Sequence, residues 1–167
     1  MLQLYDRYFP AGGARRMGEP EVWQSIYHVD PGELWETHYA LKNLMLTFVR
    51  RRMSRQCRRR GEADEVVEAA RHVLDPNILT VGFARRFATY KRANMFMWDI
   101  EKIHEMIADE DRPIQFIFSG KAHPADEPGK KLIQQIANLR HDPEIAGRVV
   151  FVEDYDINVA RHLVQGV

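Results

Sequence analysis

The hydrophobic pattern of the first half of the chain has a helical period. Between residues 30 and 60, apolar side chains recur every three or four positions, the spacing that places them on one face of an α-helix. Asp30 and Pro31 make a good start for this helix, because Asp30 can accept free N–H groups and Pro31 needs no donor at its position. Glu33 can reach back to complete a capping box, and Gly61 is a natural stop. A long helix is therefore expected here.

A shorter helix is expected over residues 62–72, before Asp75-Pro76-Asn77 breaks the pattern. Its inward-facing positions are predicted to be Val66, Val67 and Ala70.

The period changes after residue 75. Continuous apolar runs at 78–84, 114–118 and 148–152 predict three strands that are covered on both faces. Helical patterns follow each run, at 89–107, 130–139 and 158–164. Strands and helices that alternate at this spacing form right-handed crossovers and a parallel sheet. We therefore predict an α/β fold with a partial Rossmann-like βαβαβα sheet, in which residues 1–75 are a helical connecting segment and residues 76–167 are the α/β domain.

Three parallel strands with an open edge rarely make a finished domain. The sequence stops at Gln165-Gly166-Val167, where a fourth strand would begin, so we expect a fragment or a truncated product of a longer protein. The unpaired edge also predicts poor solubility or self-association.

Composition narrows the possible functions. The 167 residues have a formal net charge of zero, so no overall basic field favours nucleic acid. Cys57 is the single cysteine, which excludes an internal disulfide and a thiolate metal cluster and suits a reducing cytosol. The seven histidines are dispersed without metal-ligand spacing. No signal-peptide pattern is present, and no apolar run approaches the roughly 20 residues of a membrane span. We expect a cytoplasmic protein without a metal.

The end of the long helix, over residues 50–60, is rich in arginine. RNA binding or nuclear targeting is one interpretation. The other is a solvated helix C-terminus, where cations suit the helix dipole. No aromatic residues interleave with these arginines, and acidic residues follow at once, so we favour the solvated helix end.

Polar loops follow all three predicted strands. The carboxyl ends of parallel strands share one edge of a sheet, and ligands bind there. The loops hold several cations, carboxylates and tyrosines, and our candidate residues are Arg85, Arg86, Tyr90, Lys91, Lys121, Glu153 and Tyr155.

The first of these loops predicts an anion site. If a helix begins at Thr89, its free N–H groups and its dipole attract a phosphate beside Arg86 and Lys91. Paired cations at such a point repel each other unless an anion lies between them. The alternative is that the loop charges simply pair with one another.

In that alternative, Glu153 and Asp154 would bind Arg85 or Arg92. For Lys121 the two interpretations are evenly balanced, and His123 is expected to fix its loop rather than to catalyse a reaction. No G-x-G-x-x-G follows the first strand and no G-x-x-x-x-G-K-[ST] is present, which argues against dinucleotide and P-loop sites.

Three blocks of this sequence resemble the α-glucan (glycogen/starch) phosphorylase family, best its shorter bacterial and archaeal members. The blocks are LTVGFARRFATYKRA, FIFSGKAHPADEPGK and VVFVEDYDINVARHLVQG, and the earlier ELWETHYALKNLMLTFVRRRM looks like the helices that lead into that family's C-terminal domain. The resemblance covers residues 21–167. It implies a two-domain glycosyltransferase-B fold that holds pyridoxal 5'-phosphate, a vitamin B6 cofactor, in its cleft. The implied reaction is reversible phosphorolysis of α-1,4-glucan by inorganic phosphate, which yields glucose 1-phosphate.

The resemblance also implies roles for individual residues. Arg86 and Lys91 match the pair that binds substrate phosphate, while Arg85 and Tyr155 match residues at or near the cofactor phosphate. Vertebrate and plant members carry lysine at the position of Arg85 and arginine at that of Asp156. The cofactor lysine, a glycine-rich phosphate loop and most of the sugar-binding domain are expected to lie outside this chain. No catalytic set is complete here, so we expect an active transferase only in the full-length protein.

Two other hypotheses remain open on the sequence. A nucleotide-sugar glucosyltransferase of the same fold, such as a glycogen synthase, also places an Arg and a Lys after this strand, where they hold the diphosphate of the donor. The third hypothesis is a non-catalytic remnant that only binds anions or partners.

Overall fold

The computed structural model describes residues 2–10, 12 and 15–167. The first half is helical: α1 (Leu2–Tyr8), the 3-10 helix η2 (Pro20–His28), α2 (Pro31–Arg59) and α3 (Asp64–Ala69). The second half contains β1 (Leu79–Ala84), the 3-10 turns η3 (Thr89–Lys91) and η4 (Met95–Asp99), α4 (Ile100–Ala108), β2 (Ile114–Ser119), α5 (Glu127–Asn138), the turn η5 (Leu139–His141), β3 (Val149–Val152) and α6 (Ile157–Gly166).

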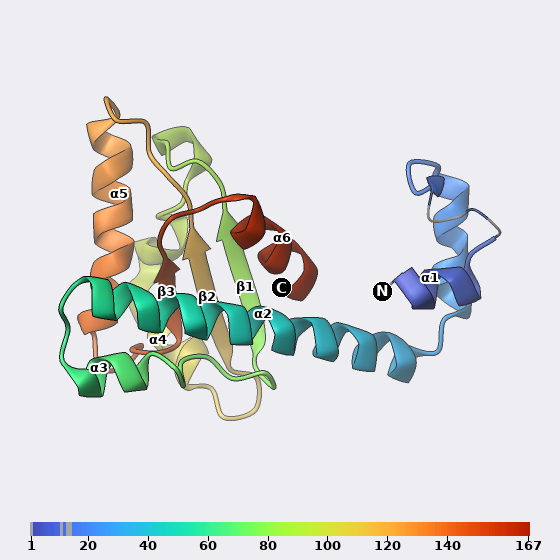
Figure 1. The fold of residues 1–167 in the computed structure, drawn as a ribbon, viewed down its shortest axis with the longest axis horizontal. Helices are drawn as coiled ribbons and strands as arrows, with labels where there is room; N and C mark the ends of the chain where they lie inside the picture. Colours follow the sequence, from blue (N-terminus) through green and yellow to red (C-terminus); the bar gives the residue numbers. More distant parts are fainter. Residues whose placement is uncertain (1, 11, 13–14) are drawn as a thin grey trace.

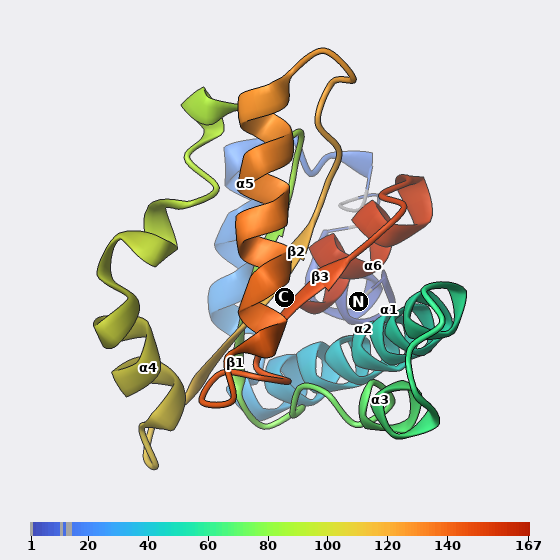
Figure 2. The same cartoon turned by 90° about the vertical axis from the view of Figure 1, so that its left-hand side faces the viewer.

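The three strands form one parallel sheet in the order β1-β2-β3, which confirms the predicted α/β class. Helices α4 and α5 cover one face of the sheet, and α2 and α6 cover the other (Figures 1 and 2). Helix α4 connects β1 to β2, and α5 connects β2 to β3. Both connections advance in the same direction across the sheet, so right-handed crossovers place both helices on the same face.

Strand β2 supplies both halves of the core, since successive side chains of a strand point to opposite faces. Phe116 and Phe118 pack with Ile103 of α4 and Ile136 of α5, and Ile117 faces the other way, toward α2 and α6. Strands β2 and β3 are almost entirely buried, as their continuous apolar runs predict.

The same prediction is wrong for β1. This strand forms one edge of the sheet, and the side chains of Leu79 and Val81 remain 62% and 44% exposed. Helix α6 crosses back from β3 and contacts β1, and a Cβ added to Gly82 would lie 2.9 Å from Cγ1 of Val167, the residue after this helix. No described element covers the outer side of this strand.

Helix α2 begins as the sequence predicts. The side chain of Asp30 accepts a 3.0 Å hydrogen bond from the N–H of Glu33. The predicted capping box is wrong, because the Glu33 carboxylate instead binds Arg7 and, at 2.7 Å, the hydroxyl of Tyr8 in α1. The first half of α2 projects away from the sheet with α1 and η2 at its far end, while its second half lies across the sheet (Figure 1).

The second predicted helix is present but shorter, as α3. Val67 and Ala70 are buried as predicted, whereas Val66 faces solvent. None of the helices in the described part of the chain combines the length and apolar character needed to cross a membrane.

Candidate functional site

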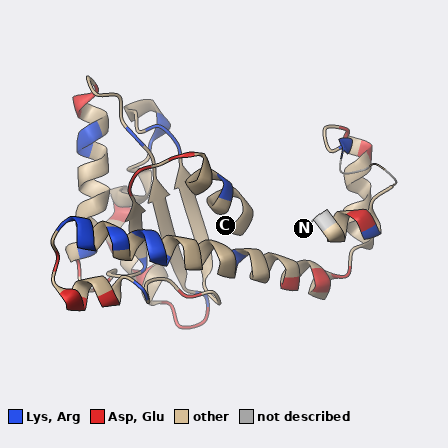
Figure 3. Cartoon of the chain, viewed as in Figure 1, with Lys and Arg blue, Asp and Glu red and all other residues tan. Residues whose placement is uncertain are grey.

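The register of the sheet brings the ends of the three strands to one level. Ala84 pairs with Ser119, and Ser119 pairs with Val152, so each strand delivers its polar loop to the same edge. Figure 3 shows basic ribbon above β1 and an acidic stretch on the connection from β3 to α6. The predicted gathering of loops at this edge is confirmed.

The loop after β1 does not open a helix as predicted. Residues Thr89–Lys91 form a single 3-10 turn, closed by Arg92 in the left-handed conformation with φ of 53°. The α-helix begins only at Ile100, where the side chain of Asp99 accepts from the N–H of Lys102. The predicted helix 89–107 is therefore wrong over its first half, and a helix dipole contributes nothing beside Arg86.

A buried aromatic residue explains the shape of this loop. Phe87 is fully buried between Phe83 and Phe151, with ring centroids 5.2 Å and 5.7 Å away. Its N–H donates a 2.9 Å hydrogen bond to the carbonyl of Lys121 in the loop after β2. Because Phe87 points into the core, the chain bends there and leaves Arg86 exposed at the rim.

Two glycines make room for this bend. A Cβ added to Gly120 would lie 2.0 Å from the carbonyl oxygen of Arg85 and 2.7 Å from the ring of Phe87. At Gly129, a Cβ would lie 2.6 Å from the carbonyl oxygen of Phe87. The sequence alone did not single out Phe87, Gly120 or Gly129 as residues of this site. The available signals were a phenylalanine inside a cationic loop and a glycine placed directly after a buried strand.

The cations of this loop are not neutralised. Among the described residues, no carboxylate forms an ion pair with Arg85, Arg86, Lys91 or Arg92. Nζ of Lys91 lies 4.7 Å from the ring centroid of its neighbour Tyr90, whose side chain is 69% exposed. The positive charge of the loop is therefore free to meet an anion.

The alternative pairing for Glu153 and Asp154 is wrong. Both carboxylates turn to α2, where Nη2 of Arg59 lies 2.6 Å from Glu153 and Nη1 lies 2.9 Å from Asp154. Arg60 also binds Glu153. The hydrogen bond to Glu153 raises the pKa of Arg59 above its ordinary value. Glu153 therefore forms its ion pairs with α2 and does not support the loop after β1.

These contacts also correct the interpretation of the arginine run. Arg59 and Arg60 bind the β3–α6 connection, Arg52 binds Asp156 at 2.7 Å, and Arg50 donates to the carbonyls of Val73 and Leu74. Arg52 and Arg59 thus bind partners about 100 positions later in the sequence. The C-terminal end of α2 is therefore a packing surface as well as a solvated helix end.

Lys121 lies on the side of β3. Its exposed side chain lines a groove of about 350 Å³ with Glu153 and Asp154, while its carbonyl holds Phe87. His123 fixes its own loop, as predicted, because its Nδ1 accepts from the N–H of Ala125 at 3.1 Å.

Tyr155 joins the ends of β3 and β1. Its hydroxyl donates a 3.3 Å hydrogen bond to the carbonyl of Ala84, the residue directly before Arg85. The next residue, Asp156, caps α6 by accepting from the N–H of Val159 at 2.9 Å. That bond, and the Arg52 guanidinium after it, lower the pKa of the Asp156 carboxyl.

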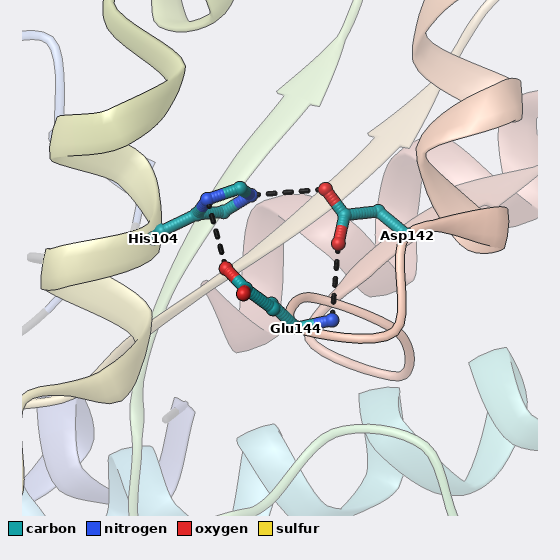
Figure 4. A group of neighbouring side chains, drawn as sticks. All are labelled: His104, Asp142 and Glu144. Carbon is teal, nitrogen blue, oxygen red and sulfur yellow. Dashed lines mark hydrogen bonds and ion pairs between the residues drawn. The ribbon is translucent and has the colours of Figure 1, made fainter.

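One polar cluster lies at the opposite edge of the sheet. His104 of α4 places Nε2 2.9 Å from Asp142 and Nδ1 3.1 Å from Glu144 in the connection before β3 (Figure 4). Each ring nitrogen faces a carboxylate oxygen, so the imidazole links α4 to that connection. The sequence did not reveal this cluster, because its members are about 40 residues apart.

A parallel sheet with unpaired cations at its carboxyl edge is typical of Rossmann-like domains that bind phosphorylated ligands. The family model for carbohydrate phosphorylases matches residues 33–167. A glycogen phosphorylase of Mycobacterium tuberculosis is 40% identical over 92% of this chain, and one of Aquifex aeolicus is 38% identical over all of it. A maltodextrin phosphorylase of Thermococcus litoralis is 35% identical over 99% of the chain.

The chain belongs to the carbohydrate phosphorylase family. It spans 18%, 24% and 19% of the lengths of these three relatives, respectively.

Proposed function

We propose that this chain is the part of an α-1,4-glucan phosphorylase that carries half of its phosphate site. The whole protein would have a glycosyltransferase-B fold and would convert glucan and inorganic phosphate reversibly to glucose 1-phosphate. The names of the relatives support this proposal, since they are glycogen and maltodextrin phosphorylases. The observation that carries it is the set of cations at the carboxyl edge of the sheet that have no carboxylate partner among the described residues.

Arg86 and Lys91 would bind the substrate phosphate. Arg86 is exposed at the rim on a loop anchored by Phe87, and Lys91 lies five positions further, where the turn closes. A guanidinium and an ammonium on one anchored loop would stabilise a doubly charged phosphate through charge-assisted hydrogen bonds. Tyr90, whose ring lies next to Nζ of Lys91, would support this pair, and Lys121 would add positive charge from the loop after β2.

Arg85 and Tyr155 would hold the phosphate of pyridoxal 5'-phosphate. The residues present fit such a group, because Tyr155 bonds the carbonyl of Ala84, next to Arg85, and the Arg85 guanidinium is exposed without a carboxylate partner among the described residues. When bound, the cofactor phosphate supplies a group that exchanges a proton with inorganic phosphate. The lysine that binds the cofactor would come from a part of the protein other than this chain.

Asp156 would not contact the cofactor. Vertebrate and plant members have arginine at this position, but here the carboxylate caps α6 and binds Arg52. We therefore assign the positive charge of the cofactor side to Arg85.

We also propose that residues 1–75 connect the two domains of the whole protein and that residues 76–167 are part of the C-terminal Rossmann-like domain. The second half of α2 packs on the sheet of that domain. A cytoplasmic location suits the single, buried cysteine and a glucan substrate.

Titration of the 167-residue chain with inorganic phosphate tests the site, followed by the amide signals of the loop after β1. We expect saturable shifts that are lost when Arg86→Ala and Lys91→Ala are combined. The control combines Arg58→Ala with Arg112→Ala, which removes the same charge from two exposed cations that lie outside the loop after β1 and form no ion pair among the described residues. Equal loss in the control, or no saturable binding by the unaltered chain, would support a non-catalytic remnant.

Activity of the complete protein that contains this chain tests the reaction. We expect release of glucose 1-phosphate from glucan in phosphate buffer. Glucan extension from a nucleotide sugar, without phosphorolysis, would overturn the proposal in favour of a glucosyltransferase of the same fold.

A further inference from the structure

Gln56 of α2 takes the place of a neighbouring strand at the end of β3. Its side chain is buried, with the residue only 5% exposed. Nε2 donates to the carbonyl of Phe151 at 3.1 Å, and Oε1 accepts from the N–H of Glu153 at 3.0 Å. These are the backbone groups that an adjacent strand would pair with, so one amide satisfies the edge where the loop begins.

Arginines of the same helix bind the residues that follow. Arg59 and Arg60 hold Glu153, and Arg59 also holds Asp154. One position after Tyr155, Arg52 holds Asp156. Both flanks of Tyr155 are therefore attached to α2, while the ring of Tyr155 packs against the core beneath α2 and its hydroxyl donates to the carbonyl of Ala84.

The backbone of this loop needs outside support. Asp154 has φ of 56°, a left-handed conformation that costs a non-glycine residue free energy. Its carboxylate is bound by Arg59, and the preceding N–H is bound by Gln56. The contacts from α2 therefore compensate for a conformation that the loop does not favour alone.

We propose that Gln56, Arg52, Arg59 and Arg60 form a clamp that positions Tyr155 against the carbonyl of Ala84 and so steadies the loop that carries Arg85 and Arg86 at the phosphate site. The clamp residues would act through the loop from Glu153 to Asp156, which they contact. The inference rests on the proposed function for the role of Tyr155, while the attachment of the loop to α2 stands on the contacts themselves. It gives the arginine run a specific role in phosphate binding.

The test combines Arg59→Met with Arg60→Met in the 167-residue chain, because methionine keeps an apolar stem and removes the guanidinium. The matched control combines Arg55→Met with Arg58→Met, two exposed arginines of the same helix without ion pairs among the described residues. Fluorine-labelled tyrosine reports on the loop, with the Tyr155 signal assigned by Tyr155→Phe. Amide exchange of Glu153 and Tyr155 is measured in parallel, together with the dissociation constant for inorganic phosphate.

In the clamp variant we expect the Tyr155 signal to move toward its unfolded position and amide exchange at Glu153 to accelerate about tenfold. Phosphate affinity should fall about threefold, the size expected for one lost neutral hydrogen bond. The control should change none of these quantities. In a Tyr155→Phe background, the clamp substitutions should lower phosphate affinity no further, because the effect passes through Tyr155.

An unchanged Tyr155 signal with unchanged exchange would overturn the clamp. So would an equal loss of affinity in the Tyr155→Phe background, because the arginines would then act through charge alone. If the unaltered chain binds no phosphate, the proposed function fails, and the fluorine signal and amide exchange still decide whether α2 holds the loop. Gln56→Glu, which keeps the acceptor and removes the donor, replaces the double variant if that variant does not fold.

Discussion

Arg52 and Asp156 are 104 positions apart in sequence, yet Nη2 of Arg52 lies 2.7 Å from Oδ2 of Asp156. The same carboxylate caps α6 through the N–H of Val159. One aspartate therefore closes a helix end and joins that helix to α2.

This pairing predicts a pH dependence of stability. The pKa of the Asp156 carboxyl is lowered in the fold, first by the Val159 N–H and then by Arg52. A carboxyl with a lowered pKa contributes stability that is present above its unfolded pKa, about 4, and is lost as pH falls through the folded value. Asp156→Asn keeps a capping side chain without the charge. We expect the unfolding free energies of the original and variant chains to differ at pH 6 to 7, by roughly the worth of one surface pair, and to converge below about pH 4. Urea unfolding across this range measures the difference, and a constant gap would contradict the assignment.

Arg86→Ala should impair phosphate use without unfolding the protein. The side chain is exposed and has no carboxylate partner among the described residues, so its removal breaks no ion pair. In the complete protein, we expect a higher KM for phosphate and a fall in kcat of about 10²-fold, the scale seen when one charge-stabilising donor is lost. Steady-state kinetics and a thermal melt test this together, with Arg112→Ala as the control. A large drop in Tm would make Arg86 a structural residue instead.

Gly120→Ala should disturb the site through the backbone. The new methyl group would lie 2.0 Å from the carbonyl oxygen of Arg85, so the loops after β1 and β2 must move apart. We expect a loss of about 1–3 kcal/mol in the free energy of unfolding, together with weaker phosphate binding. Gly18→Ala is the matched control, since a Cβ at that glycine meets no atom within 4 Å. Urea unfolding and phosphate titration provide both measurements, and equal behaviour of the two variants would refute the close approach.

The uncovered edge of β1 should drive self-association of the isolated chain. Leu79 and Val81 are exposed on a strand whose outer backbone groups pair with no described strand. Leu79→Lys with Val81→Lys should shift the chain toward monomer, whereas Ile157→Lys, at an exposed apolar position on α6, should not. Light scattering over a range of concentrations measures this. A monodisperse monomer of the unaltered chain would contradict the prediction.

Local patterns predicted the sheet well because they report burial. Strands β2 and β3 lie in the core, so their apolar runs were unambiguous, and the long helix α2 carried both its stripe and its Asp30 cap. The edge position of β1 was not predictable in this way. Its apolar run resembles that of a central strand, but Leu79 and Val81 lie on the face of α4 and α5, and these helices pack on β2 and β3 instead.

The sequence predicted which residues gather at the candidate site, but it did not predict the backbone shape of the loop after β1 or the ion-pair partners of Glu153. The period of residues 89–107 is compatible with a helix, but burial of Phe87 and Ala93 on either side of the turn favours a 3-10 segment closed by Arg92. The partners of Glu153 could not be found locally, because Arg59 and Arg60 precede it by more than 90 positions. Short-range patterns say nothing about such pairs.

The side-chain amide of Gln56 makes the β3 edge of the sheet less accessible to an additional strand than the β1 edge. An extra strand beside the end of β3 would have to displace both this buried side chain and the helix that carries it. In the described structure β1 has no neighbouring strand on its outer side, and the carbonyl of Ala84, its last residue, accepts a hydrogen bond from the hydroxyl of Tyr155. Recruitment of a further strand is therefore biased to the side of the sheet where the cationic loop emerges.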